Sequence, residues 1–364
     1  MTPPELIDRY QEVISRCDHR LTGHPRLAMA EQLSDIARWA ERYSGQDVYG
    51  TGELIESFES DIAEMLGKPA AVFLVSGTMA QNIALRIWSD RAENRAVGFH
   101  ATSHLELHEQ KAYETLYGLD GVILGDADRV VSLEDLASAP SLAAVLLELP
   151  MREIGGQLPD WETLRAQSAW CRKEEVALHM DGARLWQCSS YYQRSLAEIA
   201  ALFDSVYVSF YKDIGGIAGS VLAGPEDFVA EARTWIRRAG GNLYSLYPYV
   251  LAARAGMERN LAAIPEAVED AAWLAALFRE QLGLPTLPEN PPTNLFHLPL
   301  AADPEQLLEK AIDWSEQHCV FLMPSPNRQT DTHSILEFSL GTANRTRSRD
   351  QWEEWLVDFY GSLT

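Results

Sequence analysis

The sequence lacks any run of apolar residues long enough to cross a membrane. No window of its 364 residues holds 18 consecutive apolar side chains, so no membrane-spanning helix is expected. The first residues, MTPPELIDRYQEVISRCDHR, mix acids and bases in an amphipathic helical pattern and contain no apolar core of a signal peptide. There is also no internal repeat and no low-complexity tract.

Cysteine is scarce, and the few cysteines are scattered along the chain. Cys17, Cys171, Cys188 and Cys319 form no CxxC pair. This pattern is typical of a cytosolic chain with reduced thiols, and it argues against a disulfide scaffold or a zinc module. We therefore expect the protein to be cytoplasmic.

Positive charge is also in short supply. The chain has 30 Lys and Arg against 53 Asp and Glu, which gives a formal net charge of −23. Nucleic-acid backbones and anionic membrane surfaces would repel such a surface, so neither is expected as a partner.

Hydrophobic residues make up 46% and charged residues 23%, as in soluble globular proteins. A chain of this length can bury a large core and predicts two domains.

Short apolar runs alternate with helical patterns in the middle of the chain. Several runs are apolar throughout, as expected for strands that are covered on both faces. This alternation predicts an α/β fold with a mostly parallel sheet and helices on both sides. The strand candidates are AAVFLVSG, RAVGFH, GVILG, AAVLLELP, VALHMDGAR, SVYVSFYK and GSVLAG.

The character of the sequence changes after residue 260. A long helical pattern interrupted near Pro265 leads to the Pro-rich joint LPTLPENPPTN, and then to LFHLPL, a helical stretch, VFLM and ILEFSLG. We predict an N-terminal helical segment (1–45), a large domain (46–260) and a smaller α+β domain (261–364). The N-terminal helix could pack on the smaller domain, but no sequence pattern decides this.

Lys212 is the most unusual single residue, because it follows a buried strand pattern and enters a glycine-rich turn, YVSFYKDIGGIAGS. Apolar surroundings lower the pKa of a lysine and leave a free amine that can form a Schiff base with an aldehyde. The glycines permit close backbone approach. The alternative is a lysine that ends a strand and extends into solvent.

Asp181 ends another apolar run, in HMDGAR, with Arg184 three residues later. A carboxylate in this position can pair with a protonated ring nitrogen and make a pyridine ring an electron sink. A guanidinium can bind a phenolate or carboxylate oxygen. Alternatively, Asp181 could be the N-cap of the next helix.

Ser76, Gly77 and Thr78 lie in VSGTMAQN, where a strand pattern meets a helix pattern. Free backbone N–H groups and the positive end of a helix dipole make such a start a candidate phosphate site. In open α/β sheets ligands bind at the carboxyl ends of strands. Since Glu148, Asp181 and Lys212 also follow apolar runs, the sequence predicts one site in the large domain.

Histidines recur at four-residue spacing in HATSHLELHEQ. His104 could stack its ring on a flat cofactor. His100, His104 and His108 would share a face if all three were helical, and Glu109 lies beside them, so a metal site is an alternative. However, HExxH is absent, and RAVGFH is typical of a strand, which would start the helix no earlier than His104.

In this order, the motifs resemble those of the fold-type I pyridoxal-phosphate enzymes, and specifically the threonine aldolase and β-eliminating lyase family. The resemblance covers about Asp47 to Gly241. The matching elements are DVYGTGELIESFESDIAEMLGKPAAVFLVSGTMAQNIAL, HLELHE, LLELPMREIGGQLPDWETL, LHMDGARLW and FDSVYVSFYKDIGGIAGSVLAG.

The resemblance implies a seven-stranded, mostly parallel sheet of the fold-type I transferase kind and the cofactor pyridoxal 5'-phosphate. Its implied residue roles include Lys212 binding the cofactor aldehyde as a Schiff base, Asp181 pairing with the pyridinium nitrogen and Arg184 lying near the ring hydroxyl. It also implies that His104 stacks on the ring with Glu109 close by.

For the phosphate, the resemblance implies Ser76, Gly77 and Thr78. The candidate substrate-binding residues are Tyr49 and Arg345. The family is usually assembled from dimers with active sites between subunits, so a homodimer or homotetramer is expected.

The chain departs from the family pattern at several positions. Tyr211 precedes the lysine where aldolases usually carry serine, and Pro150-Met151 replaces a Thr-His pair whose histidine is thought to assist chemistry on the substrate hydroxyl. NLYSLYP stands where the family often supplies a phosphate-binding arginine. Glu337 falls where the family binds the substrate carboxylate with arginine, and Arg345 is the candidate substitute.

The resemblance therefore implies a lyase that cleaves the Cα–Cβ bond of a β-hydroxy amino acid to give glycine and an aldehyde. A β-eliminating lyase is the alternative within the same chemistry. A metal-dependent enzyme and a non-catalytic binding protein remain as other classes. Glu337 leaves open a biosynthetic enzyme whose substrate carries an amine in place of the carboxylate.

Overall fold

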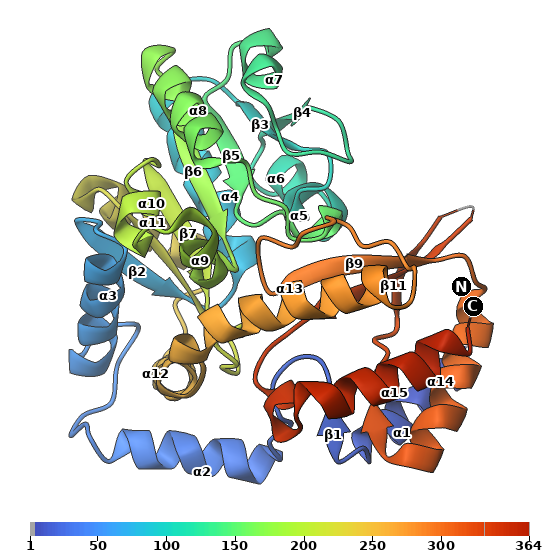
Figure 1. The fold of residues 1–364 in the computed structure, drawn as a ribbon. Helices are drawn as coiled ribbons and strands as arrows, with labels where there is room; N and C mark the ends of the chain where they lie inside the picture. Colours follow the sequence, from blue (N-terminus) through green and yellow to red (C-terminus); the bar gives the residue numbers. More distant parts are fainter. Residues whose placement is uncertain (1–3, 331, 364) are drawn as a thin grey trace. The chain divides into compact units, whose positions relative to one another are not determined.

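The computed structural model describes residues 4–330 and 332–363 and divides into two compact units (Figure 1). The large unit comprises Leu27–Glu153 and Gln157–Ala262. The small unit comprises the chain up to Arg26, the short segment Ile154–Gly156 and the chain from Ala263 onward. Within the predicted N-terminal segment (1–45), the division between the units falls between Arg26 and Leu27.

A seven-stranded sheet forms the centre of the large unit, with strand order β2-β8-β7-β6-β5-β3-β4. All neighbouring strands pair in parallel except β8, which is antiparallel to both β2 and β7. The mostly parallel sheet predicted from the apolar runs is therefore confirmed. The strands are β2 (Ala70–Leu74), β3 (Ala96–His100), β4 (Asp120–Leu124), β5 (Ala144–Glu148), β6 (Ala177–Gly182), β7 (Ser205–Ser209) and β8 (Ser220–Gly224).

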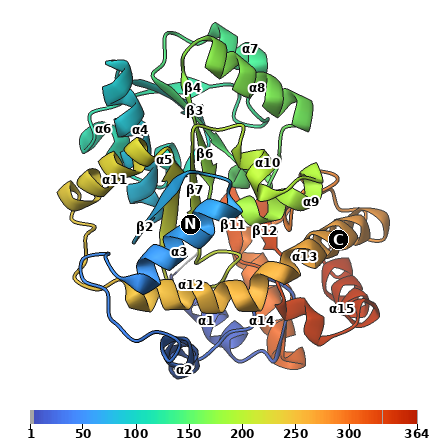
Figure 2. The same cartoon turned by 90° about the vertical axis from the view of Figure 1, so that its left-hand side faces the viewer.

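Helices cover both faces of this sheet, because successive strand side chains point to opposite sides. Val72 and Leu74 of β2 belong to the apolar cluster formed with α4 (Gly77–Ala92) and α11 (Glu226–Arg238). Phe73, between them, packs edge to face on Phe58 of α3 (Glu53–Met65). Figure 2 shows α4 and α11 on one side of the strands and α8 (Trp161–Lys173) and α10 (Leu196–Ala200) on the other.

Local capping fixes where several of the remaining helices begin. Ser132 and Asp135 form a reciprocal capping box at α7, and Ser195 and Glu198 form another at α10. The remaining helices of this unit are α2 (Met29–Ala40), α5 (His104–Leu107), α6 (Ala112–Thr115), α7 (Leu133–Ser138), α8 (Trp161–Lys173), α9 (Cys188–Tyr192), α10 (Leu196–Ala200) and α12 (Tyr247–Asn260).

The small unit is an α+β fold, as predicted. Its antiparallel sheet has the order β11-β12-β9, from β9 (Leu295–Leu300), β11 (Pro326–Gln329) and β12 (Ser334–Ser339). The strand predicted at VFLM, β10 (Val320–Phe321), lies outside that sheet and pairs in parallel with β1 (His19–Arg20). The helices are α1 (Pro4–Ser15), α13 (Ile264–Glu280), α14 (Pro304–His318) and α15 (Arg349–Gly361).

The N-terminal helix α1 belongs to the small unit and packs on α14. Its apolar face, Tyr10, Val13 and Ile14, is buried in the core of this unit. The predicted interruption near Pro265 is also confirmed, because α12 ends at Asn260 and α13 begins at Ile264 with the proline in its first turn.

The sequence analysis made predictions about membrane-spanning helices and about cysteines, and the described residues bear on both. No helix among them is long and apolar enough to cross a membrane. All four cysteines are free thiols.

Candidate active site

The carboxyl ends of three neighbouring strands meet at one cavity in the large unit. In the parallel pairing of β5, β6 and β7, Glu148 is the partner of Asp181, which is the partner of Tyr207. The cavity has a volume of about 280 Å³. It is lined by Thr102, His104, His108, Glu148, Arg152, Glu153, Asp181, Arg184 and Lys212.

Lys212 reaches this cavity from the turn that follows β7. Gly215 in that turn has φ +72°, which favours glycine, and its N–H donates to the Lys212 carbonyl at 3.0 Å. Burial lowers the pKa of Lys212, and the positive charge of Arg184 lowers it further against the opposing pull of Asp181 and Glu148. Among the residues that the structure describes, the Lys212 amine makes no hydrogen bond or ion pair.

Asp181 is almost fully buried, and both of its carboxylate oxygens accept hydrogen bonds. The Ala183 N–H donates to Oδ1 at 3.1 Å, and the Gln81 side-chain amide donates to Oδ2. Asp181 is therefore not the N-cap of a following helix. Arg184 shares the cavity, and within the described part of the chain its guanidinium has no hydrogen-bond or ion-pair partner.

His104 is the first residue of α5, and its ring is held by Glu109. Nδ1 of His104 lies 2.8 Å from Oε1 of Glu109, whose Oε2 accepts a hydrogen bond from Asn82 at 2.6 Å. Burial alone would lower the pKa of His104, but the hydrogen bond and charge of Glu109 outweigh burial and raise it. His104 thus holds a proton more tightly than a free histidine does.

His108, which caps the C-terminal end of α5, forms a second carboxylate-bound imidazole in the cavity. Its Nε2 lies 3.0 Å from Oε1 of Glu153, and Arg152 donates to the same carboxylate oxygen at 2.7 Å. The Arg152 backbone N–H donates to Oε1 of Glu148 at 3.1 Å. The rings of His104 and His108 are 5.1 Å apart between centroids.

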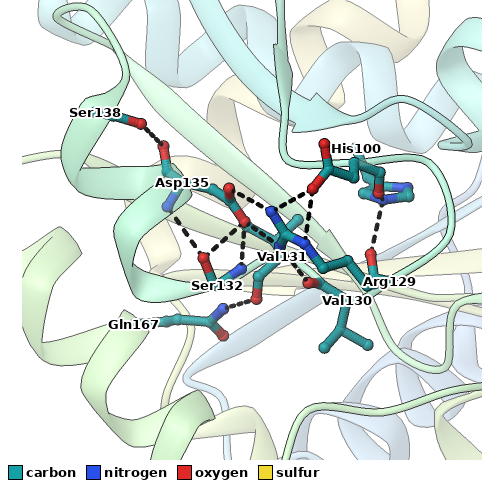
Figure 3. Close-up of polar contacts among 9 residues, drawn as sticks. His100, Arg129, Val130, Val131, Ser132, Asp135, Ser138 and Gln167 are labelled. Carbon is teal, nitrogen blue, oxygen red and sulfur yellow. Dashed lines mark hydrogen bonds and ion pairs between the residues drawn. The ribbon is translucent and has the colours of Figure 1, made fainter.

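His100 does not join the other two histidines. It is the last residue of β3, and α5 begins at His104, as the strand pattern predicted. Figure 3 shows its ring beside the segment around Arg129, where Nε2 lies 2.7 Å and 3.0 Å from the carbonyl oxygens of Asp126 and Arg129. The described residues contain no group of three His, Cys, Asp or Glu side chains that could hold a metal ion.

A bidentate ion pair holds this neighbouring segment in place. Arg129 donates to both carboxylate oxygens of Asp135 at 2.6 Å and 2.9 Å, and Asp135 also accepts from Ser132 (Figure 3). The guanidinium lowers the pKa of the Asp135 carboxyl. The histidine that could have completed a metal site is therefore part of a structural network.

Ser76, Gly77 and Thr78 form the start of α4, next to but not among the cavity-lining residues. The Ser76 hydroxyl accepts the Met79 N–H at 3.3 Å, which leaves the N–H groups of Gly77 and Thr78 without an intrahelical acceptor. One turn later, α4 carries Gln81 and Asn82, the partners of Asp181 and Glu109. The unbonded N–H groups at the start of α4 thus lie about one helical turn from the side chains that bind Asp181 and Glu109.

Gly77 has no room for a side chain. A Cβ at this position would lie 2.0 Å from the hydroxyl of Tyr207. That hydroxyl is 3.4 Å from the hydroxyl of Tyr211, the residue that precedes Lys212. The tyrosine that departs from the family pattern therefore packs beside the start of α4.

The two predicted substrate-binding residues, Tyr49 and Arg345, each have partners within their own unit. Tyr49 occupies an exposed turn of the large unit, where its ring packs edge to face on Tyr244. In the small unit, Arg345 donates to the Ala263 carbonyl at 2.8 Å and pairs with Glu266 at 3.0 Å. Within the large unit, Tyr49 is not among the residues that line the cavity around Lys212.

Glu337 has partners inside the small unit. On β12 it is paired in register with His297 of β9, at 3.5 Å between the ring and the carboxylate. Asn327 donates to the same carboxylate at 3.4 Å. Glu337 is therefore bound to neighbouring strands of its own sheet.

Several residues that line the cavity or bind its wall residues were not singled out by sequence reasoning. Gln81 and Asn82 are polar residues inside a helix, and no motif marks them. Arg152 and Glu153 follow the β5 pattern directly, in LELPMREIGG, and their charges just after a buried strand were the one available signal.

Comparison with known proteins decides the family. The sequence model of the β-eliminating lyase family matches residues 30–299, which is well over half of the chain. The chain belongs to the β-eliminating lyase family. The resemblance seen in the motifs around Lys212, Asp181 and Arg184 is thereby confirmed.

Relatives in the β-eliminating lyase family include a solved structure from Listeria monocytogenes, provisionally assigned as an L-allo-threonine aldolase. It is 38% identical, covers 99% of this chain and all of its own, and superposes with a TM-score of 0.91. The low specificity L-threonine aldolase of Escherichia coli O157:H7 is 30% identical over 65% of this chain and 72% of its own. These matches also support the fold-type I assignment of the large sheet.

An uncharacterised protein of Caenorhabditis elegans is 28% identical over 66% of this chain. The chain spans only 60% of the length of that relative. The family is thus established, whereas the activity has to be argued from the site.

Proposed function

We propose that this protein is a pyridoxal-phosphate-dependent lyase that cleaves the Cα–Cβ bond of a β-hydroxy amino acid to give glycine and an aldehyde. The observation that carries the proposal is the placement of the Lys212 amine in one cavity with Asp181 and Arg184. Family membership and the threonine aldolase names of the Listeria and E. coli relatives support the same reaction.

The donor set fits pyridoxal phosphate. Lys212 offers an unpaired amine of lowered pKa to an aldehyde, and Asp181 offers a buried carboxylate to a ring nitrogen. Arg184 offers an unpaired guanidinium to a ring oxygen. The start of α4 at Ser76, Gly77 and Thr78 offers free N–H groups to a phosphate. When bound, this cofactor supplies an electron sink for a breaking bond at Cα.

The chain's own residues prepare the site for that chemistry. Gln81 and the Ala183 N–H hold Asp181 in a fixed orientation. Glu109 orients the ring of His104, which we propose stacks on the cofactor ring. Arg152 and Arg184 both line the cavity, and Arg184 has no hydrogen-bond or ion-pair partner among the described residues, which leaves it available to the cofactor's ring oxygen.

β-Elimination is the second candidate, and the position of Met151 favours it. This residue stands where the resemblance expects a histidine that assists hydroxyl chemistry, and it is buried in the protein. Loss of the Cα proton to the freed Lys212 amine would then precede elimination. Cleavage of L-threonine and L-allo-threonine would yield acetaldehyde and glycine, whereas elimination would yield ammonia and a keto acid.

The test is a pair of lysine variants incubated with pyridoxal phosphate. Wild-type protein and the surface control Lys310→Ala should both gain a near-visible absorbance band, and Lys212→Ala should not. The substrate panel is then L-threonine, L-allo-threonine and L-serine derivatives, with products identified by NMR. A wild-type protein that stays colourless would contradict the proposal.

We also propose that the chain assembles as a homodimer or homotetramer. Large apolar side chains of the large unit are exposed, among them Met29 (83%), Leu33 (61%), Tyr244 (65%) and Tyr49 (54%). Exposed apolar groups of this size are typical of surfaces that a partner covers. Light scattering should give a multiple of the 40.7 kDa chain mass, and Leu33→Glu should shift it toward the monomer.

A further inference from the structure

Two imidazoles lie in the cavity around Lys212, and each has its own carboxylate. His104 is bound to Glu109 at 2.8 Å, and His108 to Glu153 at 3.0 Å. The two rings are 5.1 Å apart and inclined by 48°. A histidine held by a carboxylate through one ring nitrogen presents the other nitrogen to a ligand.

The hydrogen bond of His108 assigns its two nitrogens. Because an ionised Glu153 can only accept, a neutral His108 ring bound to it carries its proton on Nε2 and keeps a lone pair on Nδ1. Glu153 is 8% exposed and is also bound by Arg152, so the carboxylate has a fixed position. Within the part of the chain that the structure describes, Nδ1 of His108 has no hydrogen-bond partner.

His104 is less suited to accept a proton. The charges of Glu109 and Asp181 raise its pKa despite burial and despite Lys212, so its imidazole retains a proton more strongly. The charges of Asp181 and Lys212 both affect the pKa of His104, so His104 is electrostatically tied to the groups proposed to bind the cofactor. His108 lines the same cavity, with its ring centroid 5.1 Å from that of His104.

Among the described residues, the histidines that line the cavity are His104 and His108. Met151 is 4% exposed and lines a separate small cavity with His100 and Gln167. A proton acceptor for a substrate hydroxyl must therefore come from another element, and α5 supplies His108.

We propose that Nδ1 of His108 accepts the proton of the substrate's β-hydroxyl, and that Glu153 and Arg152 position its ring. This rests on the proposed aldolase function. The hydroxyl proton moves to Nδ1, the O–H electron pair becomes the second bond of the aldehyde C=O, and the Cα–Cβ pair stays on the amino-acid fragment. The bound pyridoxal phosphate supplies the sink for that pair.

The main test compares two reactions in His108→Asn, which keeps a polar side chain but cannot take up the proton. Cleavage of L-threonine and L-allo-threonine should fall by about 10²-fold or more, as expected for loss of a general base. Exchange of the glycine α-proton with deuterated solvent, which involves no hydroxyl, should continue at the wild-type rate. His318→Asn, on the surface of α14, is the matched control.

Three outcomes are decisive. A His108→Asn variant that cleaves like the wild type would overturn the proposal, and so would a parallel loss of cleavage and glycine exchange. A wild-type protein that binds pyridoxal phosphate yet cleaves no β-hydroxy amino acid would instead refute the proposed function.

A second measurement does not need the cofactor. In protein with ¹⁵N-labelled histidine, the His108 resonances should report protonated Nε2 and bare Nδ1. Glu153→Ala removes the acceptor and should mix the two tautomers, which a purely packing role of Glu153 would not do. A His108 ring protonated on Nδ1 in the wild type would overturn the proposal.

Discussion

Glu148 and Asp181 are paired in register on the neighbouring parallel strands β5 and β6, and both line the cavity that contains Lys212. Burial raises the pKa of Glu148, and the negative charge of Asp181 raises it further. Burial and the neighbouring charge thus both favour the protonated form of Glu148, because a second negative charge in this buried place is costly.

Glu148→Gln should make the protein's stability less dependent on pH. The folded state holds a proton on Glu148 more tightly than the unfolded state does, so the wild type should lose stability as pH rises above the usual glutamic acid pKa of about 4.3. The glutamine keeps an oxygen for the Arg152 N–H and carries no charge. Thermal unfolding across that range checks the prediction, with the exposed Glu64→Gln as control, and identical profiles would contradict it.

Glu109→Gln should lower the pKa of His104. The ion pair raises that pKa in the folded state, so it stabilises the fold below the usual histidine range, and this contribution is lost as pH rises through the folded value. The variant should therefore lose more stability at mildly acidic pH than at alkaline pH. NMR titration of the His104 ring and melting curves at both pH values measure this, and Glu309→Gln on α14 is the control.

Gln81→Leu should destabilise the protein by about 1–3 kcal/mol, because the buried Asp181 carboxylate loses a donor that a leucine of similar size cannot replace. Urea unfolding gives the free energy, and the exposed Gln306→Leu is the control. An unchanged free energy of unfolding would show that the buried amide contributes nothing to holding Asp181.

Gly77→Ala should cost about 1–3 kcal/mol of unfolding free energy, the range for overpacking a filled interior. The added Cβ would lie 2.0 Å from the Tyr207 hydroxyl, so the start of α4 or the tyrosine has to move. Gly361→Ala, at a position with no atom within 4 Å of a Cβ, should be close to neutral. Pyridoxal phosphate binding should weaken with Gly77→Ala alone, since the phosphate site is proposed at that helix start.

The apolar runs were sufficient to locate every strand of the large sheet, because six of its seven strands are buried over most of their length. The seventh, β4, is largely exposed but still carries the apolar run GVIL. The apolar runs could not distinguish β8, which runs antiparallel to its neighbours, since a buried strand reads the same in either direction. In the small unit, VFLM has the composition of a sheet strand, yet β10 pairs with β1 from the other end of the chain. Such pairing depends on how α1 packs against α14, which no local pattern encodes.

The sequence was enough to identify Lys212, Asp181 and Arg184, because each lies at or just after the end of an apolar strand pattern. Burying a charge there costs free energy, so a charged residue in that place indicates a function. The packing of α4 against the sheet brings Gln81 and Asn82 to Asp181 and Glu109, although mid-helix amides carry no sequence signal. The sequence also could not show that His100, His104 and His108 bind different partners. Equal spacing places residues on one face only within a single helix, and here His100 ends β3 while His104 begins α5. The local sequence thus determined which reactive side chains the protein has and which strand ends carry them. Only the tertiary structure decided which of these side chains contact one another, because those contacts join segments that are distant in the sequence.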